Sequence, residues 1–294
     1  MAVDVVALRA AGVGDLLTSV PALRALAAQA GPVTLAAPAW LHPLAPLIPG
    51  VAGVVDVNGL QPKRPLADAV AINLHGSGPQ SHAALLAGGP RDLVAFHCPV
   101  VWEYGPAWSI DDDEPERQRF CRLLEWIGIA ADPDLVGIKR PAAQPVASDA
   151  IVLHVGGTDP ARRWPAESFA ELARRLRGHP IVVTGGPGDL LTAQRTAQLA
   201  GLDPDRVLAG RLALDEFAAV IASARLLVSG DTGAAHLAHA YGTRSVVVFG
   251  PASVGQWGPP AGVPSRVLRA DGATPHAADV PVADVETAVR GLLA

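Results

Sequence analysis

The segment from Leu226 to Pro251, with the sequence LLVSGDTGAAHLAHAYGTRSVVVFGP, constrains the fold of this chain more than any other. An apolar run at Leu226–Val228 ends shortly before Asp231-Thr232-Gly233, and an alanine-rich stretch then continues to about Tyr241. A second apolar run, Val246–Phe249, follows. A strand, a tight turn, a helix and a second strand make one right-handed βαβ unit, so this segment predicts a parallel sheet.

The start of the predicted helix is a candidate anion-binding site. Backbone N–H groups of residues 232–235 have no partner within a helix that begins here, and no bulky side chain blocks an approach to them. The positive end of the helix dipole favours a phosphate or pyrophosphate, and His236 lies one turn into the helix. In the alternative interpretation, Asp231 only caps the helix and Gly233 only forms the turn.

Composition places the chain among globular proteins that bury a large core. Its 294 residues suffice for one large or two ordinary domains, and 50% of them are hydrophobic against 17% charged. No apolar run approaches the roughly 18 residues of a membrane span, and the first residues are typical of a strand rather than a signal peptide. Cys98 and Cys121 lack the spacing of a disulfide framework or a zinc site, so we expect free thiols and a cytoplasmic protein.

Predicted strands and helices alternate twice along the chain. The first half has predicted strands at Val3–Leu8, Val33–Ala37, Val54–Val57, Ala69–Leu74 and Leu93–Phe96, and helices at Leu16–Ala30 and Pro115–Ile127. The second half adds strands at Ile151–Val155, Ile181–Thr184 and Val207-Leu208, and helices at Ala166–Leu176, Leu190–Ala200 and Asp215–Ser223. The Pro- and Ala-rich stretch Lys139–Asp149 between the halves is typical of a linker.

This alternation predicts an α/β protein with two Rossmann-like domains, whose parallel sheets face a central cleft. We place the domains at residues 1–145 and 146–294. Ligands of open α/β sheets bind at the carboxyl ends of the strands, so the loops at those ends carry the candidate sites.

The first such loop, Ala10–Leu23, contains two of the three glycines of a dinucleotide-binding motif. Gly12 and Gly14 occupy the first two glycine positions of the motif, but Leu17 occupies the third. No acidic residue ends the strand that follows. This argues against a nicotinamide cofactor. Asp15 lies at the mouth of the predicted cleft, where it is a candidate catalytic carboxylate; alternatively, it interacts only with the start of its own helix.

Two loops of the second half carry candidate donor-binding residues. In the first, Gly157 and Thr158 follow a strand, and the guanidinium groups of Arg162 and Arg163 suit a diphosphate. The alternative is a solvated arginine pair at a helix entry. In the second, TGGPGD, Asp189 is placed either to accept hydrogen bonds from a ribose or to begin the next helix.

Four segments together resemble the ADP-heptose:lipopolysaccharide heptosyltransferases of glycosyltransferase family 9, which have the GT-B fold. These segments are GVGDLLTSVPALRAL, RRWPAESFAEL, TGGPGD and SGDTGAAHLAHAYGTRSVVVFGP. They occur in the family's order and span about residues 8–251. The Asp-Thr-Gly…His…Phe-Gly-Pro element is the most specific of them.

The resemblance implies a nucleotide-sugar donor bound by the C-terminal domain and an acceptor bound by the N-terminal domain. The family's catalytic base falls on Asp15, and the terminal helix, about Val282–Leu293, would pack back on the first domain. The implied donor contacts are the pyrophosphate binders Thr232 and Gly233 with Asp231 and His236 beside them, the ribose contact Asp189, and a backbone contact to the base near Leu212. The chain departs from the family in having Arg162 where a lysine is common, and in a longer loop after His154.

The residues agree with an inverting transfer that needs no metal. One carboxylate deprotonates the acceptor hydroxyl, and helix amides with guanidinium groups stabilise the leaving nucleoside diphosphate. No acidic pair of the DxD type occurs in a suitable loop, so we expect neither a metal nor another cofactor. The acidic run at residues 111–114 is interpreted as solvated surface that complements a helix dipole.

The charge distribution bears on the acceptor. Residues 1–150 contain 10 Lys and Arg against 15 Asp and Glu, whereas residues 151–294 contain 13 of each. The net negative charge of the first half, which would bind the acceptor, favours a neutral or cationic small molecule or glycan over phosphorylated lipopolysaccharide. We also expect no nucleic acid as a partner. Two other classes remain as alternatives: a non-catalytic nucleotide-sugar-binding module, and a nicotinamide-dependent oxidoreductase, against which the incomplete glycine motif argues.

Overall fold

The computed structural model describes residues 4–109, 111, 113–272 and 275–294, in two compact units. Residues 1–139 form the N-terminal unit and residues 140–294 the C-terminal unit. The division falls at the start of the predicted linker, whereas the sequence placed the boundary between residues 145 and 146. Two residues of predicted features, Val3 and Asp112, lie outside the described residues.

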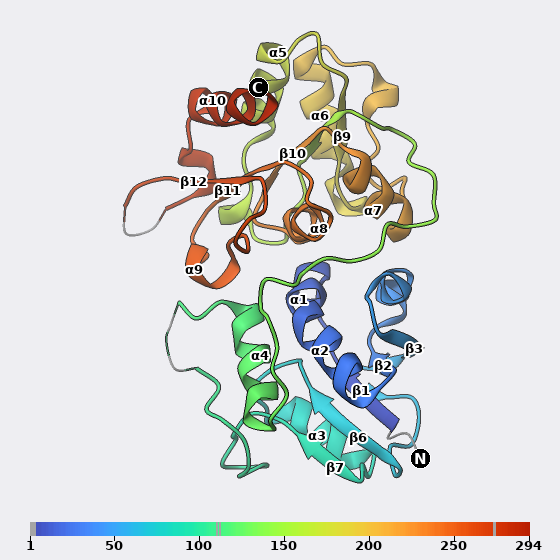
Figure 1. Ribbon diagram of the computed structural model, residues 1–294. Helices are drawn as coiled ribbons and strands as arrows, with labels where there is room; N and C mark the ends of the chain where they lie inside the picture. Colours follow the sequence, from blue (N-terminus) through green and yellow to red (C-terminus); the bar gives the residue numbers. More distant parts are fainter. Residues whose placement is uncertain (1–3, 110, 112, 273–274) are drawn as a thin grey trace. The chain divides into compact units, whose positions relative to one another are not determined.

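The N-terminal unit is built on a five-stranded sheet in which every pairing is parallel (Figure 1). The strands are β1 (Asp4–Leu8), β2 (Val33–Ala36), β3 (Val51–Val55), β6 (Ala69–Asn73) and β7 (Asp92–Val94), in the spatial order β3-β2-β1-β6-β7. This is the Rossmann order, in which the chain starts in the middle of the sheet and winds first to one side and then to the other. A small antiparallel pair, β4 (Val57–Asn58) and β5 (Gln61–Pro62), lies apart from it.

The helices of this unit are α1 (Val13–Thr18), α2 (Val20–Ala30), the 3₁₀ helix η1 (Ala39–Leu47), α3 (Gln80–Ala87) and α4 (Glu116–Trp126). The single helix predicted at Leu16–Ala30 is divided at Ser19. Pro21 at the start of α2 has no N–H to donate to the preceding turn, and the Ser19 hydroxyl donates to the Leu16 carbonyl at 2.6 Å. The sequence analysis missed α3, which makes the crossover between β6 and β7.

The C-terminal unit has a second parallel sheet of five strands with a different winding order. Its strands are β8 (Ile151–His154), β9 (Ile181–Thr184), β10 (Leu226–Gly230), β11 (Ser245–Phe249) and β12 (Ser265–Arg269), in the order β12-β11-β10-β8-β9. The predicted strand at Val207-Leu208 is only an isolated bridge from Val207 to Val183. The strand β12 was not predicted, because a partly exposed edge strand lacks a continuous apolar run.

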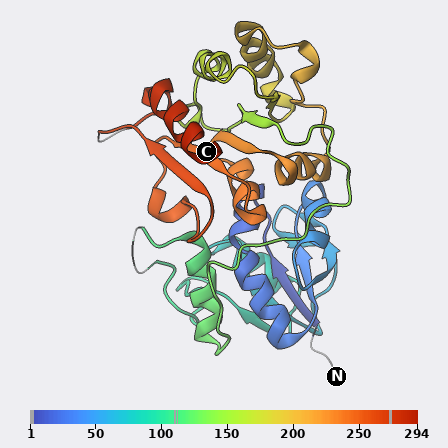
Figure 2. The ribbon, with the colours of Figure 1, turned by 45° about the horizontal axis from the view of Figure 1, so that its top comes forward.

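The helices of the C-terminal unit are α5 (Ala166–Arg175), α6 (Leu190–Ala200), α7 (Leu214–Ser223), α8 (Gly233–Tyr241), α9 (Val254–Trp257) and α10 (Val282–Leu293). Four short 3₁₀ helices are η2 (Pro160–Arg162), η3 (Pro187–Asp189), η4 (Pro204–Arg206) and η5 (Ala277–Asp279). Within this unit α10 packs on α5 and on β10, β11 and β12 (Figure 2), and the indole of Trp164 donates to the Val280 carbonyl at 3.0 Å. None of the described helices is long and apolar enough to cross a membrane.

Two glycines, one shortly before β2 and one directly before β3, test the packing of α2 in the N-terminal unit. Gly31 and Gly50 both have φ of +91°, but a Cβ at Gly50 would lie 2.1 Å from the Ala27 Cβ, whereas a Cβ at Gly31 meets nothing within 4 Å. We expect Gly31→Ala to cost about 1 kcal/mol through backbone strain alone. Gly50→Ala should cost about 1–3 kcal/mol more because α2 must move. Denaturant unfolding measures both, and equal losses would contradict this account.

Candidate functional site

In the N-terminal unit the candidate site lies at the carboxyl ends of β1 and β6. These neighbouring strands are paired from Asp4 with Ala69 to Leu8 with Asn73. The chain winds in opposite directions after them, which opens a crevice where ligands of α/β sheets bind. The predicted catalytic residue Asp15 follows β1, and the residues from Leu74 onward follow β6.

One buried guanidinium group joins the two loops. Arg9 directly follows β1 and is 1% exposed. Its Nη1 donates to the Leu74 carbonyl at 2.7 Å and to the His75 carbonyl at 3.1 Å, and its Nε donates to the Asp15 carbonyl at 2.7 Å. Burial lowers the pKa of Arg9 from its ordinary value, and the carboxylates of Asp15 and Glu116 oppose that effect. The sequence analysis missed Arg9, whose only signal is a charge at the end of an apolar strand.

The Asp15 carboxylate is held by both of its oxygens and is still accessible. Its Oδ2 accepts from the Gly12 backbone N–H at 3.0 Å, and its Oδ1 lies 3.3 Å from Arg9 Nη2. Asp15 and Gly14 both lie in the first turn of α1, so the predicted local contact at the start of the helix exists. The side chain is 37% exposed. The helix-start contact and a catalytic role are therefore compatible, since each carboxylate oxygen can accept more than one hydrogen bond.

A histidine that the sequence analysis did not identify lies beside this loop. Nδ1 of the half-buried His75 accepts from the Ala10 N–H at 3.3 Å, which places the ring proton on Nε2. Burial lowers the pKa of His75, and the Arg9 charge lowers it further. The backbone N–H of His75 donates to the side-chain oxygen of Asn73 at 2.9 Å. A polar residue just after a predicted strand was the available signal.

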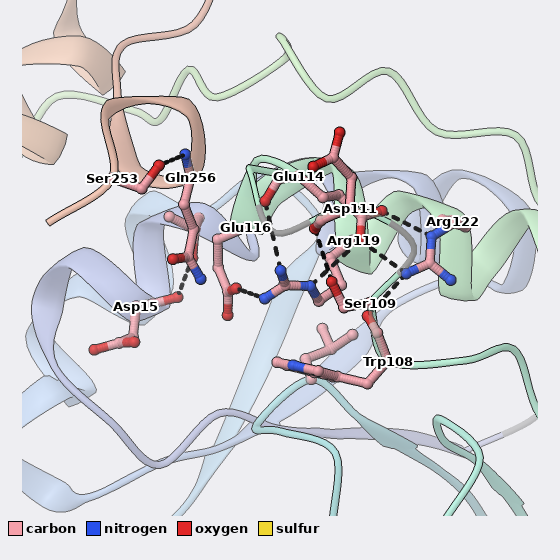
Figure 3. A network of polar contacts seen from close by, with 12 residues as sticks. Asp15, Trp108, Ser109, Asp111, Glu114, Glu116, Arg119, Arg122, Ser253 and Gln256 are labelled. Carbon is pink, nitrogen blue, oxygen red and sulfur yellow. Dashed lines mark hydrogen bonds and ion pairs between the residues drawn. The ribbon is translucent and has the colours of Figure 1, made fainter.

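Glu114, the last residue of the acidic run before α4, belongs to a buried ionic network (Figure 3). Arg122 donates from two nitrogens to the Glu114 carboxylate, at 2.7 and 2.9 Å, and Arg119 pairs with both Glu114 and Glu116. The Arg119 guanidinium lies 4.5 Å from the ring centroid of Trp108. The interpretation of the run as solvated surface is wrong for Glu114, which is buried because the arginines of α4 compensate its charge.

In the C-terminal unit the order of the strands reverses between β8 and β10, and ligands of open α/β sheets bind beside such a reversal. The loop after β8 carries Gly157, Arg162 and Arg163, and the loop after β10 carries the start of α8. A Cβ at Gly230 would lie 2.6 Å from the Arg162 carbonyl oxygen, and one at Gly157 would lie 3.8 Å from Thr232 Cγ2. The structure therefore brings the loop of Gly157 and Arg162 together with the predicted anion site at the start of α8.

The start of α8 differs in detail from its prediction. Thr232, with φ −147° and ψ 173°, is the N-cap, so the interpretation of Asp231 as the N-cap is wrong. Ala235 N–H donates to the Thr232 carbonyl at 3.0 Å and is not free, because the first turn tightens. Gly233 is the first helical residue. The Thr232 hydroxyl is buried and has no hydrogen-bond partner among the described residues.

Asp231 forms an ion pair with Arg162 instead. The Asp231 carboxylate is 2% exposed, and Arg162 Nη2 contacts it and also donates to the Asp231 carbonyl at 2.9 Å. His236 lies on the other side, with its Nε2 4.0 Å from Asp231 Oδ1 and its ring edge-on to Trp257. Part of the Arg162 charge is therefore compensated within the protein, although its Nε has no partner in the described part of the chain.

The second arginine and Asp189 form a neighbouring cluster. Arg163 Nε donates to the Gly157 carbonyl at 2.6 Å, and its Nη2 lies 3.9 Å from Asp189 Oδ1. Asp189 Oδ2 accepts from the Gly186 N–H at 2.9 Å, so its predicted role at the start of a helix has a structural basis. Thr158 is exposed at the tip of its loop.

Leu212 is half-buried just before α7. Two residues earlier, the Gly210 N–H donates to the Gly185 carbonyl at 3.0 Å. This contact places the stretch that precedes Leu212 against the TGGPGD loop and thus beside Asp189.

His154 ends β8 within the same cluster and was not singled out from the sequence. Burial lowers the pKa of His154 to about 4, and Asp189 opposes this effect. Its Nδ1 lies 3.1 Å from Thr184 Oγ1, and its ring lies against Phe217 at 5.3 Å between centroids. A neutral imidazole at pH 7 adds hydrogen-bonding capacity without charge.

The predicted free thiols are confirmed: Cys98 and Cys121 are both buried, and neither forms a disulfide. Burial raises the pKa of Cys121 to about 12, so this thiol is protonated at neutral pH. Across residues 4–109, 111, 113–272 and 275–294, no group of three or more His, Cys, Asp and Glu side chains is arranged to hold a metal ion.

Comparison with known proteins identifies the family. The model of glycosyltransferase family 9 (heptosyltransferase) matches residues 107–280. The chain belongs to this family. Lipopolysaccharide heptosyltransferase 2 of Escherichia coli K12 is 36% identical over 118 residues, which are 37% of this chain and 33% of that protein. Lipopolysaccharide heptosyltransferase 1 of Pseudomonas aeruginosa is 34% identical over 156 residues, 52% of this chain and 43% of that protein. The matches thus span a third to less than half of these relatives.

Solved structures of the family share the fold over the whole chain. A glycosyltransferase family 9 protein from Veillonella parvula has a TM-score of 0.81 at 19% identity, covering 100% of this chain and 98% of its own. An E. coli heptosyltransferase solved with ADP has a TM-score of 0.75 at 20% identity, covering 98% and 99%. The predicted fold class, an α/β protein with two Rossmann-like sheets of the GT-B type, is confirmed.

The buried ion pair of the C-terminal unit yields a prediction about stability. Asp231→Ala leaves the Arg162 guanidinium, which is 31% exposed, without its carboxylate partner. We expect a loss of about 2 kcal/mol of unfolding free energy, since water reaches Arg162 and reduces the cost of a fully buried unpaired charge. Glu171→Ala, which breaks an exposed pair with Arg175, should cost less than about 1 kcal/mol. Denaturant unfolding of both variants measures the difference, and equal losses would contradict the burial argument.

Proposed function

We propose that this protein is an inverting glycosyltransferase that moves a sugar, a heptose in the favoured case, from a nucleoside diphosphate to an acceptor hydroxyl. Membership of glycosyltransferase family 9 supports the class of reaction. The curated relatives are lipopolysaccharide heptosyltransferases, and one E. coli relative was solved with ADP-2-deoxy-2-fluoro heptose. These names favour ADP-heptose as the donor.

The start of α8 is the observation that carries the proposal on the donor side. It follows β10 at the crevice of the C-terminal sheet, and its N-cap hydroxyl, Thr232 Oγ1, is buried without a partner among the described residues. An anionic diphosphate satisfies such a hydroxyl together with the first-turn amides at Gly233 and gains from the helix dipole. Arg162, whose Nε has no partner within the described chain, and Arg163 add positive charge nearby.

The chemical step follows from these groups and from Asp15. Asp15 accepts the proton of the acceptor hydroxyl while the hydroxyl oxygen forms a bond to the anomeric carbon. The bond from that carbon to the diphosphate oxygen breaks, and the nucleoside diphosphate leaves with the electron pair. Attack opposite the leaving group inverts the anomeric configuration. The amides of α8 and the guanidinium groups stabilise the charge that develops on the leaving diphosphate.

The acceptor we favour is a neutral or cationic small molecule or glycan, rather than phosphorylated lipopolysaccharide. Residues 1–150 contain 15 acidic against 10 basic side chains, so the field of this half attracts cations and repels phosphates. A non-catalytic nucleotide-sugar-binding module is the second candidate, because the Asp15 carboxylate also serves the start of α1 through Gly12. The two candidates differ in turnover, which only the enzyme shows.

The donor site predicts the effects of two substitutions on nucleotide binding. Gly233→Val places a branched side chain where a phosphate meets the backbone of α8, and Arg162→Ala removes a cation. Each should weaken ADP binding at least about tenfold, Arg162→Ala by the loss of one charge-assisted hydrogen bond and Gly233→Val by steric exclusion of the phosphate. Calorimetric titration with ADP and other nucleoside diphosphates measures this. Gly291→Val, at an exposed position of α10 with no neighbouring atom within 4 Å of the added Cβ, is the control. Unchanged affinity in both site variants would refute the assignment.

The catalytic assignment predicts that Asp15→Asn lowers turnover by about 10²–10⁴-fold, the usual contribution of a general base. Donor affinity should be unchanged. Asparagine retains an oxygen for the Gly12 N–H, so the start of α1 is preserved. Release of nucleoside diphosphate in the presence of acceptor measures turnover, and calorimetry measures donor affinity. A variant with normal donor binding and near-full activity would show that Asp15 only stabilises the helix.

The proposed stabilisation of the leaving group involves no metal ion and predicts that a chelator has no effect. Turnover of the protein dialysed against EDTA should equal that of the untreated protein, and added Mg²⁺ or Mn²⁺ should not increase it. Nucleoside diphosphate release is the assay, with a metal-dependent glycosyltransferase as the control for chelation. A loss of turnover that added metal restores would overturn the proposal of a metal-independent transfer.

A further inference from the structure

The ionic network of the N-terminal unit reaches the carboxylate of Asp15. Its members alternate in charge along a chain of contacts that starts at the proposed base. In order, they are Asp15, Arg9, Glu116, Arg119, Glu114 and Arg122. Figure 3 shows Glu116 and Arg119 turned toward each other between Asp15 and Arg122.

Exposure to solvent differs sharply between Asp15 and the middle members of this chain of contacts, and Arg122 at the far end is 16% exposed. Arg9, Glu116, Arg119 and Glu114 have side chains that are 2–6% exposed, whereas that of Asp15 is 37% exposed. Buried charges are tolerated only when they are paired, and these three cations and three anions balance. Only Asp15 is both a member of the network and substantially open to solvent.

Arg9 is shared between two carboxylates. Its Nη2 lies 3.3 Å from Asp15 Oδ1 and 3.4 Å from Glu116 Oε1. The guanidinium also lies 4.6 Å from the ring centroid of Phe120, and its other nitrogens are bound to backbone carbonyls. It is therefore fixed in place, so its effect on Asp15 depends on how much of its charge Glu116 compensates.

We propose that Glu116 sets the proton affinity of Asp15 by sharing the Arg9 guanidinium, and so acts as a positioning and tuning residue for the proposed base. An arginine that faced Asp15 alone would favour the ionised carboxylate and make it a poor proton acceptor. The buried negative charge of Glu116 offsets that effect. This inference rests on the proposed role of Asp15 in catalysis.

Other charged and titratable groups of this unit act on Asp15 less strongly. His75 follows β6 and interacts with Asp15, but burial and Arg9 both lower the pKa of His75, so its ring is neutral at pH 7. Arg119 on α4 acts through Glu116 rather than by direct contact. The balance between Arg9 and Glu116 therefore dominates among these groups.

The test is the pH dependence of Glu116→Gln. Glutamine keeps the shape and an acceptor oxygen for Arg9 and removes the charge. Asp15 should then hold its proton less tightly, so the acidic limb of the kcat profile should move to lower pH by on the order of one unit. The plateau should also fall, since a weaker base catalyses less well. The ¹³C resonance of the Asp15 carboxyl carbon can be assigned because it is missing from the spectrum of Asp15→Asn. The midpoint of its pH titration should move in the same direction, and this measurement requires no turnover.

The matched control is Glu114→Gln, the same change at an equally buried carboxylate of the network that contacts Arg119 and Arg122 instead of Arg9. The acidic limb of the kcat profile should shift clearly less in Glu114→Gln than in Glu116→Gln. If Glu116→Gln is unstable, the double variant Glu116→Gln/Arg119→Gln replaces it, because this variant keeps the network neutral. Its acidic limb should shift in the same direction. Equal shifts for Glu116→Gln and Glu114→Gln, or none, would overturn the inference. An Asp15→Asn variant with full activity would instead refute the proposed function, while the carboxyl titration would still test the coupling.

Discussion

The burial of a positive charge at the end of β1 determines the arrangement of the N-terminal unit. A guanidinium group that is almost fully buried must have hydrogen-bond acceptors, and Arg9 obtains them from three segments, two of which are distant from it in sequence. The first turn of α1, the loop after β6 and the start of α4 meet where their carbonyl and carboxylate oxygens surround this side chain. The position of Asp15 is a consequence of this requirement.

The C-terminal unit meets a similar requirement with the charges reversed. There the most buried charge is the Asp231 carboxylate, and Arg162 from the neighbouring loop compensates it. The strands of the two sheets follow different orders. Nevertheless, the Arg9–Asp15 pair and the Arg162–Asp231 pair both lie at the carboxyl ends of strands where the winding direction reverses. In both units one partner is more exposed than the other, which leaves a polar group near solvent in a position fixed by the buried partner.

The apolar strands and the βαβ unit at residues 226–251 could be predicted because burial on both faces of a parallel sheet leaves a local signal in the sequence. The ionic network could not, since Arg9 and Glu116 are 107 residues apart and neither has a local pattern that indicates burial. The alternative interpretation of Asp231 as a cap is wrong for a related reason. Asp before Thr-Gly fits a helix start, and only the approach of Arg162, 69 residues earlier, shows that its carboxylate is used elsewhere.

The start of α8 lacks a side-chain cap, and the carboxylate of Asp231, one residue before the N-cap, is bound to Arg162. Thr232 occupies the N-cap position but makes no capping bond, although threonine caps helices well. An uncapped helix start with a buried, unpartnered hydroxyl, in the part of the chain that the structure describes, is unfavourable unless a ligand supplies the acceptor. In the proposed donor site, an anion would supply this acceptor at the start of α8. A carboxylate at the cap would repel a diphosphate, so the same pairing serves both the fold and the proposed donor site.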